Sequence, residues 1–170
     1  MPDGERWVIT LDMPRPPKGL HANDRPSHWS KARATKELRS LVYYKVMSAK
    51  VPTMYRCRVD VEWVVKTRAK RDLDNLAPML KVIYDAVGSD RGISAHVVPD
   101  DDPAHMEKPG ATIRYDKLTT PYFRVTITRR YISTRIGTVR AAWVLYDNDG
   151  DFKEISEDRA EALMSAGGGS

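Results

Sequence analysis

The sequence predicts a small α/β (α+β) protein, a mixed sheet with packed helices, and three observations support this class. Two segments, near 27–50 and 76–87, carry apolar residues at helical spacing. Residues 56–65 alternate charged and apolar side chains, as a half-buried strand does. The length of 170 residues and a hydrophobic content of 41% fit one domain with a real core, or one domain plus a short appendage.

The N-terminal elements are bounded by prolines. Residues 7–13 are short and rich in β-formers, and they end at a Pro-rich loop, so a first strand is predicted there. A loop over 18–26 follows. Ser27 or Ser30 can cap the first helix, which should extend to about Lys50, ahead of Pro52. Its apolar positions form a helical stripe: Leu38, Leu41, Val42, Val46 and Ala49.

The second half predicts a helix, closing strands and a weaker C-terminal part. In the helix at 76–87, Pro78 falls in the first turn, where it is tolerated, and Asp74 or Asn75 can supply the cap. A loop is expected at 88–98. Strands are predicted at 112–115 and 122–128, with a further strand at 139–146 and a short helix at 156–164. Cys57 and three tryptophans are expected in the core: Trp7, Trp63 and Trp143.

The charge is unevenly distributed. The chain has a formal net charge of +5, but residues 1–130 carry +8 and residues 131–170 carry −3. A basic body with an acidic C-terminal extension favours a polyanionic partner, although a soluble protein with charged faces is the simpler interpretation. The role of the extension is not predicted beyond the hypothesis that it limits non-specific DNA binding.

Composition also excludes several classes. No apolar run reaches the roughly 18 residues that a bilayer span needs, so no membrane association is expected. The N-terminus lacks the apolar region of a secretory signal. A single cysteine excludes an intramolecular disulfide and a cysteine-built metal site, and it favours a reducing, cytoplasmic location.

The chemistry-bearing residues form an ordered series. A basic stretch at 66–71 leads into Asp72 and Asp74, a helix with Lys81 follows, and an acidic loop spans 100–102. Paired carboxylates suit Mg²⁺, which takes carboxylate oxygens, waters and substrate phosphates. At strand-like spacing, Asp72 and Asp74 would leave the backbone on one side. A capping sequence and a solvated acidic loop are the simpler alternatives for the same residues.

This order resembles the RusA family of Holliday junction resolvases over roughly residues 7–130. The match is carried by Arg71-Asp-Leu-Asp-Asn75, by Lys81-Val-Ile-Tyr-Asp85 and by Pro99-Asp-Asp-Asp102. The resemblance implies a small mixed α/β homodimer that cuts four-way DNA junctions by paired nicks and requires Mg²⁺, for which Mn²⁺ is a plausible substitute.

The resemblance also assigns roles to residues. It implies that Asp72, Asp74 and Asp101 hold the metal and that Lys81 stabilises the scissile phosphate, so these four are the candidate catalytic residues. Asp100 and Asp102 are alternatives for the third ligand, because one extra aspartate leaves the register open. Leu76–Leu80 place the lysine farther from the motif than in the family, by about one helical turn or ~5 Å. The predicted DNA-binding cations are Lys66, Arg68, Lys70, Arg71, Arg25, Lys31 and Arg33.

Two other functions remain open from the sequence. The first is a non-catalytic DNA-binding module, such as a recombination accessory protein, in which the aspartates only cap and solubilise. The second is a nuclease of the same chemistry that acts on other branched DNA, such as flaps. The segment Asp147–Asp151 superficially resembles a Ca²⁺ loop, but a turn is predicted, because Gly150 and Asp158 do not match the EF-hand pattern.

Overall fold

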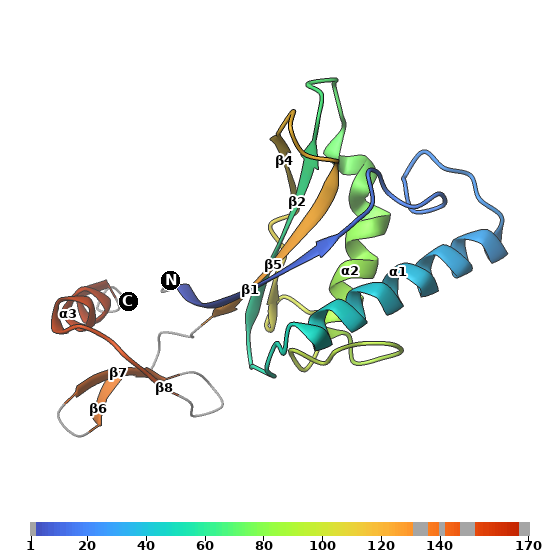
Figure 1. Ribbon diagram of the computed structural model, residues 1–170. Helices are drawn as coiled ribbons and strands as arrows, with labels where there is room; N and C mark the ends of the chain where they lie inside the picture. Colours follow the sequence, from blue (N-terminus) through green and yellow to red (C-terminus); the bar gives the residue numbers. More distant parts are fainter. Residues whose placement is uncertain (1–2, 131–135, 140–141, 147–151, 167–170) are drawn as a thin grey trace.

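The computed structural model describes residues 3–130, 136–139, 142–146 and 152–166. It confirms the predicted mixed class, with three α-helices and a five-stranded sheet that contains both parallel and antiparallel pairs (Figure 1). The sheet has the order β1-β5-β2-β3, with β4 also paired to β2. Its strands are β1 (Asp3–Leu11), β2 (Cys57–Val65), β3 (Met106–Glu107), β4 (Ala111–Tyr115) and β5 (Tyr122–Arg130).

Strand β2 lies at the centre of the sheet, paired with β3, β4 and β5, and its alternating pattern gives it one buried face. Cys57, Val59 and Val61 are buried, whereas the charged residues between them are only partly buried. Antiparallel β5 pairs with both β1 and β2, and it sets Val125 opposite Val61 and Ile127 opposite Val59. The apolar face formed by these strands requires a cover, which the helices provide.

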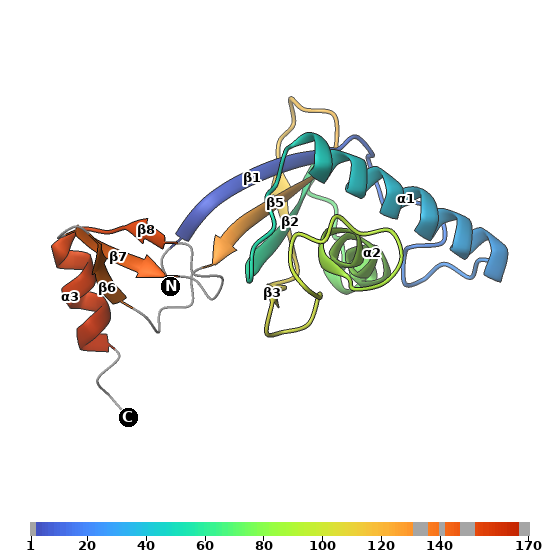
Figure 2. The ribbon, with the colours of Figure 1, turned by 90° about the horizontal axis from the view of Figure 1, so that it is seen from below.

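Two helices, α1 (His28–Ser48) and α2 (Ala77–Gly88), pack on the same face of the sheet (Figure 2). Ser27 is the N-cap of α1, because its side chain accepts a hydrogen bond from the Ser30 amide at 3.2 Å. The apolar stripe of α1 points to the core as predicted, with Leu38, Val42 and Val46 buried.

The second helix is buried over more of its surface than its apolar stripe predicts. Val82, Tyr84 and Ala86 are buried in addition to most of the predicted stripe, of which only Leu80 is partly buried. The segment after α2 covers the extra surface, because the amides of Ala95 and Val97 donate to carbonyls in the last turn of the helix. The loop predicted at 88–98 is therefore fixed against α2.

A three-stranded antiparallel sheet and a third helix form the C-terminal part. They comprise β6 (Ile136–Val139), β7 (Ala142–Tyr146), β8 (Phe152–Glu154) and α3 (Glu157–Ala166). The strand predicted at 139–146 corresponds to β7 and the end of β6, with residues 140–141 outside the described part. The predicted turn at 147–151 also lies outside it. The helices that the structure describes are all too short or too polar to span a bilayer.

Candidate functional site: two acidic groups along α2 and a basic hollow

The segment Asp72–Asn75 begins with a helix cap. Asp72 is the N-cap of a 3-10 turn, η1 (Leu73–Leu76), which leads directly into α2. Its Oδ1 accepts a hydrogen bond from the Asp74 amide at 3.0 Å. The cap is therefore Asp72, and not Asp74 or Asn75, because the helical path begins with the 3-10 turn, before α2 itself.

Asp72 and Asp74 are both exposed at the start of this helical path. The predicted strand-like relation between them is wrong. Asp72 has an extended backbone, with φ −99° and ψ 111°, but Asp74 already lies in the first turn of η1. The rule that side chains two apart point to one side of a strand does not apply across this change of geometry. Both carboxylates lie at a helical N-terminus, where negative charge is favoured.

Two aspartates of the acidic loop are engaged in the turns of that loop. Asp100 Oδ1 accepts a hydrogen bond from the Asp101 amide at 2.8 Å. Asp102 Oδ1 accepts from the amides of Ala104 and His105 at 2.8 and 3.0 Å, and it lies 2.9 Å from His105 Nδ1. Local side-chain to backbone bonds of this kind are an ordinary use of aspartate in turns.

Asp101 has a different environment from its two neighbours. Its Oδ2 accepts a hydrogen bond from Lys108 Nζ at 2.8 Å, and Lys108 also lies over the ring of Tyr84. Partial burial would by itself raise the pKa of the Asp101 carboxyl, but the hydrogen bond and charge of Lys108, with the charge of Lys81, hold that pKa below its ordinary value. Asp101 is therefore ionised at neutral pH.

Lys81 is oriented toward its own helix. Its side chain is 74% exposed, and Nζ lies 3.3 Å from Asp85 Oδ1, one turn further along α2. Arg39 of α1 approaches the same carboxylate at 3.9 Å. Seven residues separate Lys81 from Asp74, which is roughly 10 Å along a helix axis. Lys81 thus lies farther along α2 than the Asp72–Asn75 segment. The acidic loop lies farther still, at the end of the helix, because the amide of Asp90 donates to Asp100 Oδ1 at 3.4 Å.

The expected three-carboxylate metal site is not assembled in this conformation. Within the ranges that the structure describes, no three His, Cys, Asp or Glu side chains are placed to hold one metal ion. Asp72, Asp74 and Asp101 all lie in those ranges. The residues present therefore fit a divalent ion only in part, through the exposed Asp72/Asp74 pair, since Mg²⁺ is often held by one or two carboxylates with waters and substrate phosphates.

The basic stretch at 66–71 contains two kinds of cation. Lys66 and Lys70 are exposed at the end of β2. Arg71, in contrast, holds the stretch together: its Nη1 donates to the carbonyls of Thr67 and Ala69 at 2.8 and 2.9 Å, and its Nη2 donates to Thr67 Oγ1 at 3.0 Å. Arg71 thus has a structural role, and its DNA-binding role remains a prediction.

The remaining predicted cations lie at two other places. Arg68 stacks over the Tyr115 ring, with its guanidinium carbon 4.8 Å from the ring centroid. Arg25, Lys31 and Arg33 are exposed just before and within the first turns of α1. These cations are accessible to a ligand, but they define no closed site.

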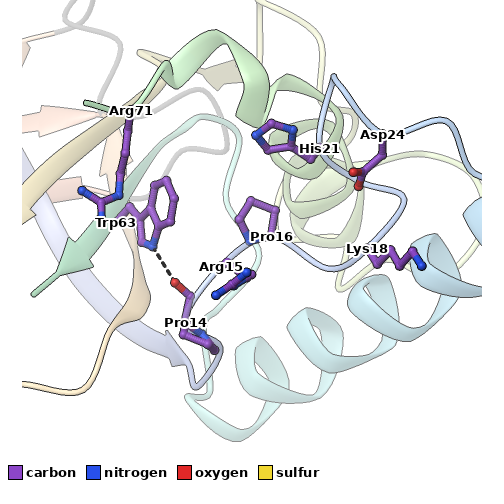
Figure 3. A pocket seen from close by; sticks show the side chains of 8 residues that line it. All are labelled: Pro14, Arg15, Pro16, Lys18, His21, Asp24, Trp63 and Arg71. Carbon is purple, nitrogen blue, oxygen red and sulfur yellow. Dashed lines mark hydrogen bonds between the residues drawn. The ribbon is translucent and has the colours of Figure 1, made fainter. Parts of the chain in front are cut away.

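A hollow of about 640 Å³ lies beside the Asp72–Asn75 segment (Figure 3). The Pro-rich loop after β1 forms much of its wall, and Trp63 and Arg71 form the opposite part. The Ala22 amide donates to the Asn75 carbonyl at 2.9 Å, which fastens this loop to the acidic segment. The lining residues are Pro14, Arg15, Pro16, Lys18, His21, Asp24, Trp63 and Arg71.

Of the eight residues that line the hollow, only Arg71 was predicted as a site residue, so the cations Arg15 and Lys18, the polar His21 and Asp24, and Trp63 are all additions. The two cations stand among prolines in a stretch that the sequence identifies only as a loop, and Trp63 was expected in the core. Trp63 does stack on Phe123, with ring centroids 5.3 Å apart, but it also lines the hollow and donates from Nε1 to the Pro14 carbonyl at 3.1 Å. The sequence signal that could have indicated this site is the presence of two cations, Arg15 and Lys18, within four residues of the Pro-rich loop.

Comparison of the chain with models of known protein families and with curated proteins finds no match.

Proposed function

We propose that this protein is a metal-dependent, structure-selective DNA endonuclease that resolves four-way junctions, as the RusA family that it resembles does. One observation carries the proposal: the exposed carboxylates of Asp72 and Asp74 follow a stretch whose cations Lys66, Arg68 and Lys70 are exposed. A DNA backbone drawn to these cations by counterion release would bring its phosphates next to two carboxylates. This juxtaposition suits phosphodiester hydrolysis better than simple DNA binding, for which exposed acids are unfavourable.

Asp72 and Asp74 would hold Mg²⁺, or Mn²⁺ in its place. Asp101 is the proposed third ligand, and it would have to come closer to that pair when the ion binds, because the three carboxylates, which all lie in the described ranges, form no metal-binding group in this conformation. The ion, when bound, would activate water and neutralise charge on the phosphate. The chain's own side chains would bind and orient the DNA: Lys66 and Lys70 by their exposed charges, and Lys81 at the phosphate to be cut. A homodimer would present two such sites with two-fold symmetry, which suits paired nicks.

The test compares cleavage of a synthetic four-way junction in Mg²⁺ by the wild type, Asp74→Asn and Asp72→Asn. Asparagine also caps helices, so Asp72→Asn should change the free energy of unfolding by less than about 0.5 kcal/mol, whereas Asp72→Ala should cost about 0.5–2 kcal/mol. Cleavage should fall at least a hundredfold in both asparagine variants while junction binding persists. Glu157→Gln, which removes one exposed charge from α3, is the matched control and should cut normally.

A non-catalytic DNA-binding module is the second candidate. Asp72 already has a capping role, and the described residues contain no three-ligand group, which are the observations that favour it. Undiminished cutting by both asparagine variants would refute our proposed site, and a wild type that binds junctions without cutting them would establish the module. Linear, flap and junction substrates compared side by side would separate a resolvase from a flap nuclease.

A further inference from the structure

We propose that the hollow beside the Asp72–Asn75 segment binds one unpaired nucleotide of a DNA strand, with the phosphate at the Arg71 end and the base at the His21 end. This inference rests on the proposed function, because it takes DNA as the ligand. It names the feature of a branched substrate that the protein would recognise: a nucleotide that has left the duplex near the branch.

Arg71 defines the phosphate end of the hollow. Arg71 lies beside Trp63 at one end of the hollow, and Arg15 lies nearer its middle, next to Pro14 and Pro16 (Figure 3). Arg71 is held by its bonds to residues 67 and 69, so little side-chain freedom is lost when it meets an anion. Lys18 adds a third positive charge at the far side of the hollow from Arg71, toward Asp24, whose carboxylate is the single negative charge among the lining residues (Figure 3). The hollow is therefore electropositive and suits a phosphodiester.

The opposite end offers groups that can read the edge of a base. The Nδ1 atom of His21 accepts a hydrogen bond from the Asn23 amide at 3.3 Å, so the neutral ring carries its proton on Nε2 and can donate from it. Asp24 Oδ2 accepts from the Gly19 amide at 2.7 Å, which leaves Oδ1 as an acceptor. A donor and an acceptor match the hydrogen-bonding edge of a base, and that edge is accessible only when the base is unpaired.

Trp63 holds the phosphate end in place, but it does not provide a stacking surface. One face of its ring lies parallel to Phe123, at an interplanar angle of 13°. The Arg71 guanidinium carbon lies 5.3 Å from the ring centroid on a cation-π contact. Since Trp63 is engaged by both partners, the apolar contacts for a sugar and base come from Pro14, Pro16 and the His21 ring.

The size and the location of the hollow agree with this ligand. A volume of about 640 Å³ lies within the range of small-molecule sites and is ample for one nucleotide unit. The bond between Ala22 and Asn75 ties the wall of the hollow to the segment that bears Asp72 and Asp74. A captured nucleotide would therefore lie next to the proposed cutting site, which would favour cleavage close to a branch point.

Fluorescence anisotropy with the full chain tests the proposal, without divalent metal so that no cleavage occurs. The probes are a fluorescein-labelled 20-nucleotide single strand and the continuous duplex of the same sequence. His21→Ala should weaken single-strand binding about fivefold or more and leave duplex binding within about twofold, because only an unpaired base reaches His21. Its salt dependence should not change.

A second variant removes two of the three cations that line the hollow and tests whether they contact phosphates of the strand. Arg15→Gln/Lys18→Gln should weaken single-strand binding about tenfold and reduce the slope of log affinity against log salt by about 1.4, or 0.7 for each lost phosphate contact. The control Lys50→Gln/Arg91→Gln removes two exposed charges outside the hollow and should change neither probe by more than about twofold. Arg15 and Lys18 are both exposed, so the double variant should still fold.

Equal effects of His21→Ala on both probes, or no effect on either, would overturn the proposal. Failure of the nuclease proposal is distinguishable from this result. A chain that never cuts a junction but binds single strands through His21 refutes the nuclease and supports the hollow. A chain whose cutting requires Asp74, but whose single-strand binding is unchanged in His21→Ala, supports the nuclease and refutes the hollow as the binding site.

Discussion

Gly88 is the last residue of α2, and the segment that leads to the acidic loop packs closely against it. Replacing Gly88 by alanine should therefore destabilise the fold. A Cβ atom at this position would lie 2.4 Å from Val98 Cγ2 and 2.8 Å from Met106 Cε. The Met106 methyl is the end of a flexible side chain and can move. Val98 cannot easily retreat, because it is 1% exposed and the adjacent Val97 amide is bonded to the Val87 carbonyl at 3.0 Å.

The magnitude follows from two opposing terms. Replacing a helical glycine by alanine should stabilise α2 by about 0.8–1.0 kcal/mol through helix propensity. Overpacking a well-packed core costs about 1–3 kcal/mol, and a contact as short as that with Val98 belongs near the upper end. We therefore expect Gly88→Ala to lower the free energy of unfolding by about 1–2 kcal/mol, a substantial part of the total for a domain of this size.

Urea denaturation followed by circular dichroism measures this change, and a double variant identifies its cause. Val98→Ala alone should cost about 2 kcal/mol, because it leaves a cavity. In Gly88→Ala/Val98→Ala the clash with Cγ2 is gone, so the double variant should be at least about 1 kcal/mol more stable than the sum of the single changes predicts. A neutral or stabilising Gly88→Ala, or strict additivity, would refute the close-packing argument.

Three further predictions concern the charged groups and the cysteine. Lys108→Met should raise the pKa of Asp101 toward its ordinary value of 3.8, as carboxyl NMR titration would measure. The Asp101 pKa is depressed in the folded state, so the ion pair with Lys108 stabilises the fold above pH 4, by about 0.5 kcal/mol for a half-exposed pair, and this stabilisation is lost as the pH falls through the folded pKa. The free energies of unfolding of the variant and the wild type should therefore differ at pH 7 and converge in acid. Burial, with a smaller effect of the Glu107 charge, raises the pKa of Cys57 to about 12, so a thiol reagent at pH 8 should modify it only on unfolding; rapid reaction of the folded protein would contradict this. Arg71→Lys should increase amide exchange over residues 66–71, since lysine cannot make the three bonds of the guanidinium, and unchanged exchange would show that these bonds do not hold the stretch.

The elements that the sequence predicts well are those with local causes. The alternation in β2 and the apolar stripe of α1 each reflect a single buried face of the element. Ser27 and Pro78 each influence only the first turn of their own helix. The two-residue strand β3 has no such local signature, because its pairing with β2 depends on where the acidic loop returns to the sheet. The burial of α2 on further faces is likewise a consequence of tertiary packing.

The hollow shows the same limit at the level of the site. Its walls come from residues 14–24 and 63–71, which are distant in sequence and meet only because the loop after β1 packs against the segment before α2. The acidic loop gives a related case. Three adjacent aspartates are equivalent as a sequence, but the turn engages Asp100 and Asp102 through backbone amides and leaves Asp101 to Lys108.

Local hydrogen bonds account for three of the aspartates discussed above and Lys108 pairs with a fourth, Asp101, which leaves Asp74 without such a role among the residues that the structure describes. Asp72 caps η1, and Asp100 and Asp102 close turns, so these three would be retained in a protein without any catalytic function. Asp74 contributes its backbone amide to the cap, but within the described part of the chain its carboxylate takes part in no hydrogen bond or ion pair. A favourable position at a helical N-terminus contributes only about 0.3–1 kcal/mol. The hypothesis that the acids merely cap and solubilise therefore predicts a functionally silent Asp74→Asn, whereas the nuclease hypothesis requires the loss of cutting, and this residue separates the two most directly.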